Sequence, residues 1–174
     1  RREGLGNPLH AGQELVCGVP TDTDWALPMD QIPRCEATVT LRVVEGYQAA
    51  EFSAESRGLF YRSAFQVSPR SDRMGYRLEG NAVAAPAGER FSEGIAYGAV
   101  QVPPDGQPIV LLNDRQTIGG YPKLGTVLSL DCWKLAQCVP GAKVCFEAIS
   151  LEAAQAAVEE FTATREATAL KRST

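Results

Sequence analysis

Residues 97–112 read YGAVQVPPDGQPIVLL, and this stretch decides the fold class. Two apolar runs, 97–102 and 108–112, flank a short polar segment whose tip is Asp105-Gly106. An Asp-Gly pair between such runs is a strong signal for a β-hairpin, because glycine adopts the backbone angles that tight turns need. The sequence therefore predicts two adjacent antiparallel strands.

Further β-forming runs lie on both sides of this hairpin. The expected strands span residues 37–45, 65–67, 76–79, 126–130 and 143–147. Pro140-Gly141 predicts a turn before the last of them. Many short strands separated by Gly and Pro are typical of a barrel. We therefore expect a mainly β fold, a closed or nearly closed β-barrel with peripheral helices.

Two helices are expected beside these strands. A short one is predicted within residues 51–63. A C-terminal helix is predicted to begin after Ser150, whose hydroxyl suits an N-cap. Apolar residues then recur on one helical face at Leu151, Ala154, Val158 and Phe161. Beyond Thr162 apolar residues become sparse, so we expect the last residues to fray.

The N-terminal residues 1–35 differ from the rest of the chain. They are rich in Gly, Pro and Asp and are expected to be irregular, with one strand at most. The first residue is Arg1, which indicates a fragment, a processed chain or an incomplete one.

Composition excludes several classes of protein. The chain of 174 residues suits one domain, and 44% hydrophobic with 22% charged residues is ordinary for a globular protein. A net charge of −4 offers no broad basic surface for nucleic acid. No apolar run approaches the roughly 20 residues of a membrane span. Five cysteines without a Cys-x-x-Cys pair, and no signal peptide, predict a reducing, cytoplasmic location and no zinc site.

The usual catalytic motifs are also missing from the sequence. His10 is the single histidine, so a Ser-His-Asp triad or a multi-histidine metal site within this chain is not expected. There is no Walker loop and no glycine-rich dinucleotide motif after a strand. Chemistry in this chain would rest on arginines, carboxylates, amides, hydroxyls and backbone N–H groups.

The first segment that concentrates such groups is residues 71–78. In an extended strand, Gly75 and Arg77 share one face and Tyr76 takes the other. Arg73 and Arg77 at a loop-to-strand transition suit a carboxylate or a phosphate, which guanidinium groups bind with two hydrogen bonds. The alternative is a surface Arg–Asp network, worth only about 0–1 kcal/mol.

The second segment is residues 113–122, which follow the apolar run 108–112. Asp114 suits a general base, and Gln116 and Thr117 suit hydrogen bonds to an amide. Gly119-Gly120 allows the close approach of a ligand. The alternative is a tight turn capped by the aspartate.

Both segments resemble one protein family. The matching runs are SDRMGYRLEG (71–80), SEG (92–94), GAVQVP (98–103), DGQPI (105–109) and DRQTIGGYP (114–122). They resemble the allophanate hydrolase subunit 2 family, which includes biotin-dependent carboxyltransferases, 5-oxoprolinase subunits and KipA-like proteins. The likeness covers residues 65–150 closely. It implies a cyclophilin-like closed β-barrel with peripheral helices and a C-terminal helix.

The resemblance also implies a missing part. Family members normally begin with a further domain whose motifs do not occur here. Segment 1–35 is therefore interpreted as the remnant of a link to that domain, and residues 36–174 as the cyclophilin-like carboxyltransferase domain. If the active site lies between that domain and this one, the 174-residue chain alone is expected to be inactive.

Three functions follow from the resemblance. The first is a subunit of a cytoplasmic, ATP-dependent 5-oxoprolinase complex that converts 5-oxoproline to glutamate. The second is a biotin-dependent carboxyltransferase acting on urea or a related amide, and only this one uses biotin. The third is a non-catalytic module that binds a kinase inhibitor. All three imply a partner, the KipI-like subunit 1 of the family, and the first two imply a small amide or lactam substrate.

The chemistry of the matched positions suggests a role for each. The residues expected to carry catalysis are Asp114, Arg73 and Arg77. The residues expected to bind substrate are Gln101, Gln116, Thr117, Gly119, Gly120 and Tyr121. We expect the arginines to bind an anionic group, the aspartate to serve the amide nitrogen or the attacking water, and the amides to orient the N–C=O unit. The tyrosine would close over the ligand.

Overall fold

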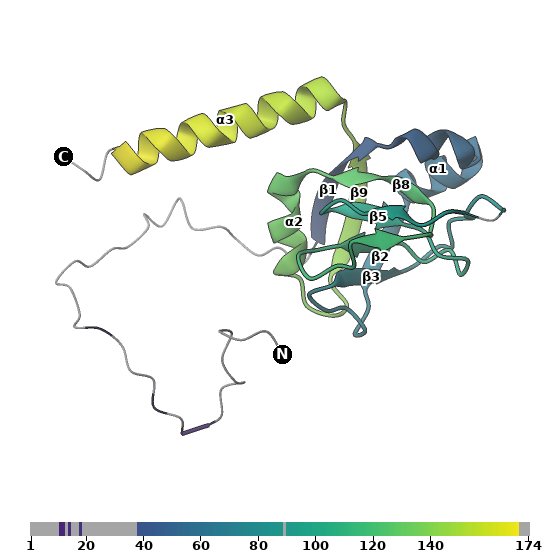
Figure 1. The fold of residues 1–174 in the computed structure, drawn as a ribbon, viewed down its shortest axis with the longest axis horizontal. Coiled ribbons are helices and arrows are strands. Elements are labelled where there is room, and N and C mark those ends of the chain that lie inside the picture. The colour runs from purple at the N-terminus through teal and green to yellow at the C-terminus, as the bar shows by residue number, and fades with distance from the viewer. Residues whose placement is uncertain (1–10, 13, 15–17, 19–37, 89, 171–174) are drawn as a thin grey trace. The chain divides into compact units, whose positions relative to one another are not determined.

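The computed structural model describes residues 38–88 and 90–170, together with residues 11, 12, 14 and 18 (Figure 1). The chain divides into two compact units, Arg1–Pro33 and Arg34–Thr174, and the fold below is that of the second. Almost all of the predicted irregular segment 1–35 lies outside the described residues, as does the predicted boundary after it. Both stay predictions.

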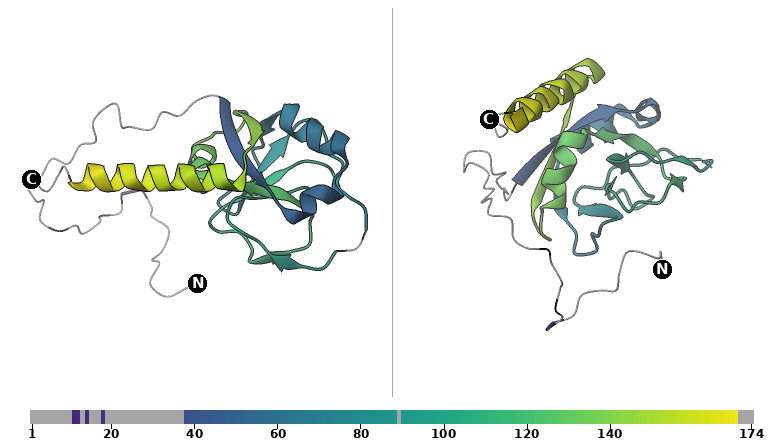
Figure 2. Two further views of the ribbon diagram at one scale, coloured as in Figure 1. Left: turned by 90° about the horizontal axis from the view of Figure 1, so that it is seen from above. Right: turned by 60° about the vertical axis from the view of Figure 1, so that its left-hand side comes forward.

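Seven strands close into a barrel, which confirms the mainly β prediction (Figures 1 and 2). Their order around the barrel is β1-β8-β5-β6-β3-β2-β9. The strands are β1 Thr38–Glu45, β2 Ala64–Val67, β3 Gly75–Glu79, β5 Ala99–Gln101, β6 Ile109–Leu111, β8 Lys123–Val127 and β9 Lys143–Ala148. Neighbours are antiparallel except β1 and β9, which run parallel.

The predicted hairpin is confirmed as β5 and β6. The two strands are antiparallel, with Val100 opposite Val110. Gly106 takes a φ of 73°, a conformation open chiefly to glycine, and its N–H donates to the carbonyl of Pro103 at 2.9 Å. The turn chemistry that predicted this pair therefore operates as expected.

The two predicted helices are present. Helix α1 (Ala54–Arg62) is capped by Ser53, whose hydroxyl accepts from the N–H of Ser56 at 3.1 Å, and the 3-10 helix η2 (Tyr47–Glu51) precedes it. Helix α3 (Leu151–Leu170) begins with the hydroxyl of Ser150 accepting from the N–H of Ala153 at 3.2 Å. The helix continues to Leu170, and the last residues, 171–174, lie outside the described residues, so their fraying stays a prediction.

One predicted strand was partly wrong. The run 126–130 was expected to be extended, but β8 ends at Val127 and helix α2 (Ser129–Ala136) follows. The β-forming residues before 129 gave a local signal for strand. The helix is fixed instead by tertiary contacts, since Cys132 and Leu135 are fully buried in the core at helical spacing.

A buried carboxylate fastens α2 to the barrel. Asp131 is fully buried and accepts from Arg42 Nε at 2.8 Å, Arg42 Nη2 at 2.9 Å and Lys134 Nζ at 2.8 Å. Burial alone raises the pKa of this carboxyl, but the hydrogen bonds from Arg42 and Lys134 outweigh it and lower the pKa. Asp131 is therefore an ionised anchor.

The barrel has one apolar core inside and a small apolar cluster outside. The interior residues include Leu41, Val43, Phe60, Phe65, Leu78, Val100, Val110, Leu124 and Phe146. A separate buried cluster consists of Ile95, Ala99, Ile109 and Leu111. Since side chains alternate along a strand, Ala99, Ile109 and Leu111 lie on the outer face of β5 and β6.

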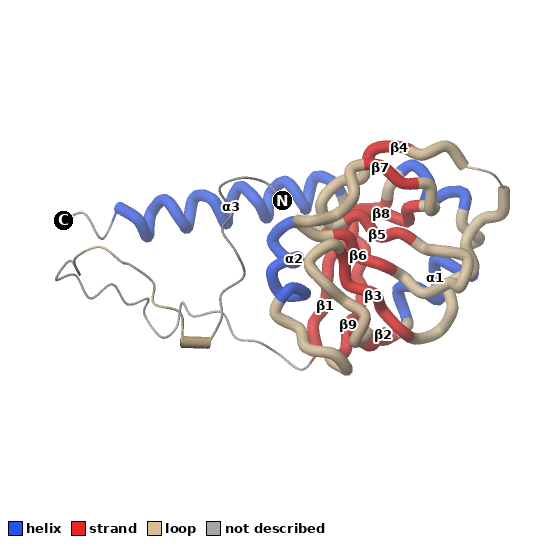
Figure 3. Tube along the Cα trace, turned by 60° about the horizontal axis from the view of Figure 1, so that its bottom comes forward, coloured by secondary structure: helices blue, strands red, loops and turns tan. Residues whose placement is uncertain are grey.

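A short ribbon lies apart from the barrel wall. It pairs β4 (Glu93–Gly94) with β7 (Ile118–Gly119), and both are drawn outside the barrel strands in Figure 3. Within the described residues, no helix combines the length and apolar character that crossing a bilayer demands.

Candidate functional site

Three strands present a row of side chains on the outside of the barrel. Arg77 on β3 is opposite Ile109 on β6, and Ile109 is opposite Gln101 on β5. Neighbouring strands are about 4.8 Å apart, so the backbones of Arg77 and Gln101 are about 10 Å apart. Both side chains are long enough to reach one small ligand above Ile109.

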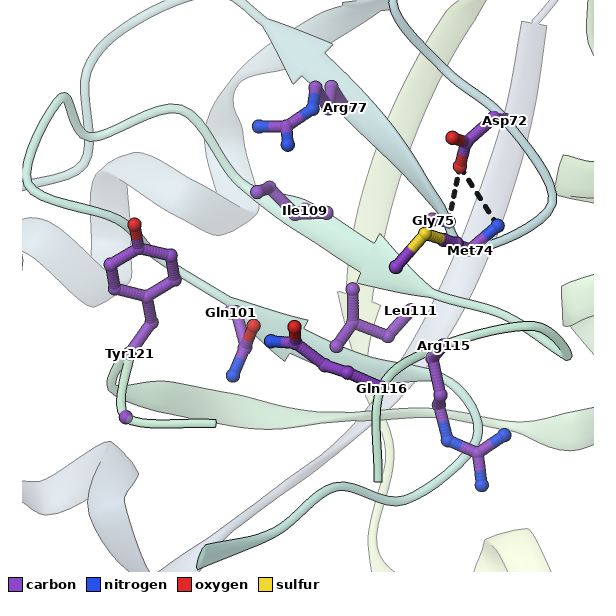
Figure 4. A pocket seen from close by; sticks show the side chains of 11 residues that line it. Asp72, Met74, Gly75, Arg77, Gln101, Ile109, Leu111, Arg115, Gln116 and Tyr121 are labelled. Atoms are coloured by element: carbon purple, nitrogen blue, oxygen red, sulfur yellow. Dashed lines mark hydrogen bonds between the residues drawn. The ribbon is translucent and has the colours of Figure 1, made fainter. Parts of the chain in front are cut away.

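A cavity of about 620 Å³ lies over this row (Figure 4). Its size falls within the roughly 300–1,000 Å³ of small-molecule sites. It is lined by Asp72, Met74, Gly75, Arg77, Gln101, Ile109, Leu111, Arg115, Gln116, Gly120 and Tyr121. The predicted shared face of Gly75 and Arg77 is confirmed, and five of the predicted site residues come together here.

Gln101 is the most informative of these residues. The residue is only 2% exposed, yet its Nε2 has no hydrogen-bond partner among the described residues. A buried, unpaired donor costs roughly 1–3 kcal/mol. In contrast, buried Gln48 donates from Nε2 to Tyr47 and accepts from the N–H of Lys123 at 2.7 Å. An unpaired amide facing a cavity is expected where a ligand supplies the acceptor.

Glycine at position 119 leaves room for two amides. A Cβ at Gly119 would lie 2.7 Å from Ile95 Cδ1, 2.9 Å from Gln116 Nε2 and 3.2 Å from Gln101 Nε2. Figure 4 shows the side chain of Gln116 reaching toward Gln101 across the floor of the cavity. A larger residue would displace Ile95 and one or both amides.

The two cavity arginines have different roles. The guanidinium of Arg77 is exposed and makes no hydrogen bond or ion pair with a described residue. Arg115, which sequence analysis did not single out, donates to the carbonyls of Ile95 at 3.0 Å and Leu112 at 3.1 Å. Its guanidinium also lies 5.8 Å from the ring centre of Tyr97 and points away from Gln101 (Figure 4). Arg77 is therefore free for a ligand, whereas Arg115 holds its loop.

Two predicted catalytic residues lie elsewhere. Arg73 and Asp114 form an ion pair at 3.1 Å, with side chains 90% and 48% exposed. They line a second cavity of about 330 Å³ together with Tyr76 and Tyr97. The alternation of Tyr76 and Arg77 along β3 separates this cavity from the first.

Asp72 is a carboxylate that sequence analysis missed. It lines both cavities, and its Oδ1 accepts from the N–H groups of Met74 at 2.9 Å and Gly75 at 3.2 Å. The signal was present, because an Asp shortly before a Gly is typical of a turn closed by the carboxylate. Asp72 thus brings a carboxylate to the rim of the main cavity.

The remaining predicted residues lie at the edges of the main cavity. Thr117 is exposed and does not line it, but its carbonyl accepts from the N–H of Ile95 at 3.0 Å. Tyr121 is partly exposed and separates the main cavity from a neighbouring one of about 440 Å³. Among the described residues, no three His, Cys, Asp or Glu side chains gather as a metal site requires.

Comparisons with known proteins identify relatives. The family model described as carboxyltransferase domain, subdomain A and B, matches residues 2–148. The chain is 44% identical over 115 residues to a 5-oxoprolinase subunit of Escherichia coli, covering 66% of this chain and 37% of that protein. It is 27% identical over 161 residues to a putative urea carboxylase of Emericella nidulans, covering 84% of this chain and 13% of that protein.

A solved structure shares the fold. The crystal structure of Kluyveromyces lactis urea carboxylase superposes with a TM-score of 0.65 at 22% identity, over 74% of this chain and 12% of that one. The chain spans only a minor part of the length of each of these relatives.

Proposed function

The chain belongs to the carboxyltransferase domain family, subdomain A and B, and from this premise we propose that it is part of a subunit of an ATP-dependent 5-oxoprolinase complex. The reaction opens the lactam ring of 5-oxoproline with water and gives glutamate. The observation that carries this proposal is the buried, unpaired amide of Gln101 in a cavity that also holds the unpaired guanidinium of Arg77. 5-Oxoproline combines a lactam, which suits the amide of Gln101, with a carboxylate, which suits the guanidinium of Arg77.

Gln101 and Gln116 act on the lactam. The Nε2 of Gln101 donates to the lactam oxygen, which gains negative charge as water adds to the carbonyl carbon. A fixed donor at such an oxygen contributes about 3–4 kcal/mol in other enzymes. Gln116 reaches toward the same place and offers its amide oxygen to the lactam N–H.

Arg77 acts on the carboxylate. Its guanidinium has no competing partner among the described residues, so it can form two parallel hydrogen bonds with the substrate. The separation of about 10 Å between the backbones of Arg77 and Gln101 places their side-chain ends around one small molecule. Ile109 between them forms the apolar floor under the ring.

Two carboxylates are candidates for activating water. Asp72 lines the main cavity, and Asp114 lines the second one, where it pairs with Arg73. A general base contributes typically 10²–10⁴ in rate. We favour Asp72 because it shares the cavity with the two amides, whereas Asp114 is ion-paired in the second cavity. The kinetics of Asp72→Asn and Asp114→Asn distinguish the two.

ATP, the KipI-like partner subunit 1 and the cytoplasmic location belong to the proposal at the level of the complex. The described residues do not fit a triphosphate, since the main cavity holds one unpaired guanidinium and the sequence has no phosphate-binding loop. We therefore place ATP on another part of the complex and derive no step of this chain through it.

The alternative is carboxyl transfer to urea or a related amide, with biotin as the carboxyl carrier. The relative named putative urea carboxylase favours it. Urea offers an N–C=O unit to Gln101 and Gln116 but no anionic group to Arg77. The unpaired arginine therefore weighs for the oxoprolinase reaction.

The experiment is a reconstitution of the full-length subunit with its partner subunits. We expect ATP-dependent formation of glutamate from 5-oxoproline that disappears when this subunit is left out. A stable complex without turnover would contradict the proposal and favour urea-type transfer or a regulatory role.

A further inference from the structure

The run Ser92-Glu93-Gly94 has a carboxylate that the proposed site does not use. Glu93 accepts from the hydroxyl of Tyr47 and from Nε2 of Gln48, and it forms an ion pair with Lys123 Nζ at 3.1 Å. Three donors from two other parts of the chain therefore converge on this one carboxylate.

These donors are themselves tied together. The backbone N–H of Lys123 donates to Oε1 of Gln48 at 2.7 Å, and Lys123 Nζ donates to the carbonyl of Gly94 at 3.0 Å. Only 15% of the Lys123 side chain is exposed. Glu93 thus joins β4 to η2 and to the start of β8, which belongs to the barrel wall.

The ribbon that Glu93 holds adjoins the cavity, whose lining includes Gln116 and Gly120 on either side of β7. Glu93 is opposite Gly119 in the β4–β7 pair, and the N–H of Ile95 donates to the carbonyl of Thr117 at 3.0 Å. Arg115 also donates to the carbonyl of Ile95. A two-stranded ribbon is at best marginally stable by itself. Its placement therefore depends on contacts outside the ribbon, which are the packing of Ile95 on the barrel, the bond from Arg115 and the donors to Glu93.

We propose that Glu93 is a positioning residue, which fixes β4 on η2 and β8 and so holds residues 116–119 over the barrel. Gln116 and Gly119 then stay against Gln101, in the arrangement that the cavity requires. The kinetic part of this inference rests on the proposed function, whereas the mechanical part rests on the contacts alone.

The charge state of Glu93 separates positioning from proton transfer. The hydrogen bond from Tyr47, followed by that from Lys123, lowers the pKa of Glu93. The carboxylate is therefore ionised throughout the neutral range. Loss of a positioning carboxylate changes the rate without moving the limbs of the pH–rate profile, whereas loss of an acid or base removes a limb.

The test uses Glu93→Gln in the full-length subunit within its complex. Glu45→Gln is the matched control. Glu45, at the end of β1, is a surface glutamate of similar exposure and forms an ion pair with Arg57 at 3.3 Å. Tyr47→Phe, which removes one donor and keeps the ring, serves if Glu93→Gln unfolds. The measurements are hydrogen exchange of the amides of residues 117–120, 5-oxoproline kinetics, and the same substitution in a Gln116→Ala background.

The expected result is faster exchange at residues 117–120 in Glu93→Gln and unchanged exchange in Glu45→Gln. We expect kcat/KM to fall about 10- to 100-fold, as for small misplacements of binding groups, with the pH profile unchanged in shape. In the Gln116→Ala background, the same substitution should cost less than about threefold, because coupled sites are not additive.

Three results would overturn the inference: unchanged exchange at residues 117–120, an altered pH limb, or full additivity of Glu93→Gln with Gln116→Ala. If the wild-type complex does not turn over 5-oxoproline, the proposed function fails. The exchange comparison then decides by itself whether Glu93 anchors the ribbon.

Discussion

Replacing Gln101 by methionine should make the protein more stable and less active at once. Gln101 is almost fully buried with an unpaired Nε2, so the free protein bears a desolvation cost of roughly 1–3 kcal/mol that an apolar side chain of similar length removes. The Tm of the full-length subunit should therefore rise. Turnover should fall about 10²–10³-fold, the loss seen when one donor to a developing oxyanion is removed.

The assay pairs thermal unfolding of the full-length subunit with turnover of its complex. Gln48→Met is the matched control, because Gln48 is also buried but its amide is paired on both sides. This control should lower Tm. The reasoning is refuted if Gln101→Met lowers Tm as Gln48→Met does, or if it raises Tm and leaves turnover intact.

Three further predictions concern the buried Asp131, Gly119 beside the two amides, and the candidate base Asp72. Asp131→Asn should lower the free energy of unfolding by about 3 kcal/mol at pH 7, the lower end of the cost of breaking a buried ion pair, because Arg42 and Lys134 are partly exposed. The pKa of Asp131 is lower in the folded than in the unfolded protein, so this stability is present above about pH 4 and is lost as pH falls through the folded pKa. Denaturant unfolding measured as a function of pH should show that dependence in the wild type and not in the variant. Gly119→Ala should reduce kcat/KM at least tenfold while Tm moves by only a few degrees, since the new Cβ meets the ends of flexible side chains. A large fall in Tm together with the loss of kcat/KM would count against a substrate site at this position. Asp72→Asn should lower kcat about 10²-fold or more and Asp114→Asn by less than about threefold; the reverse order, in the same kinetic assay, would move the base to the second cavity.

The sequence predicted those parts of the fold that local chemistry determines. The hairpin of residues 97–112 and the cap at Ser150 depend on neighbouring residues, and both are confirmed. Helix α2 was missed because residues 126–128 are β-forming, whereas the helix is fixed by distant contacts such as that of Asp131 with Arg42.

The candidate site shows the same division. Arg73 and Arg77 are close in the chain and were assigned one role, but they line different cavities. Arg73 lies in the turn before β3 and pairs with Asp114, whereas Arg77 lies on the outer face of β3. Gln101 and Arg77 are brought together by the register of three strands, which sequence spacing does not reveal. The positioning role proposed for Glu93 depends on its contact with Tyr47, which precedes it by 46 residues, and no local sequence pattern predicts that contact.

The measurement that tests the central claim most directly is the kcat/KM of the reconstituted complex for 5-oxoproline with Arg77→Met, beside Arg73→Met as the control. A hydrogen bond to a charged group is worth about 1.5–3 kcal/mol, so Arg77→Met should lower kcat/KM by roughly 10- to 150-fold. Arg73→Met, whose guanidinium pairs with Asp114 outside the main cavity, should change it by less than about threefold. An Arg77→Met complex that turns over 5-oxoproline like the wild type would contradict the assignment of this cavity as the substrate site.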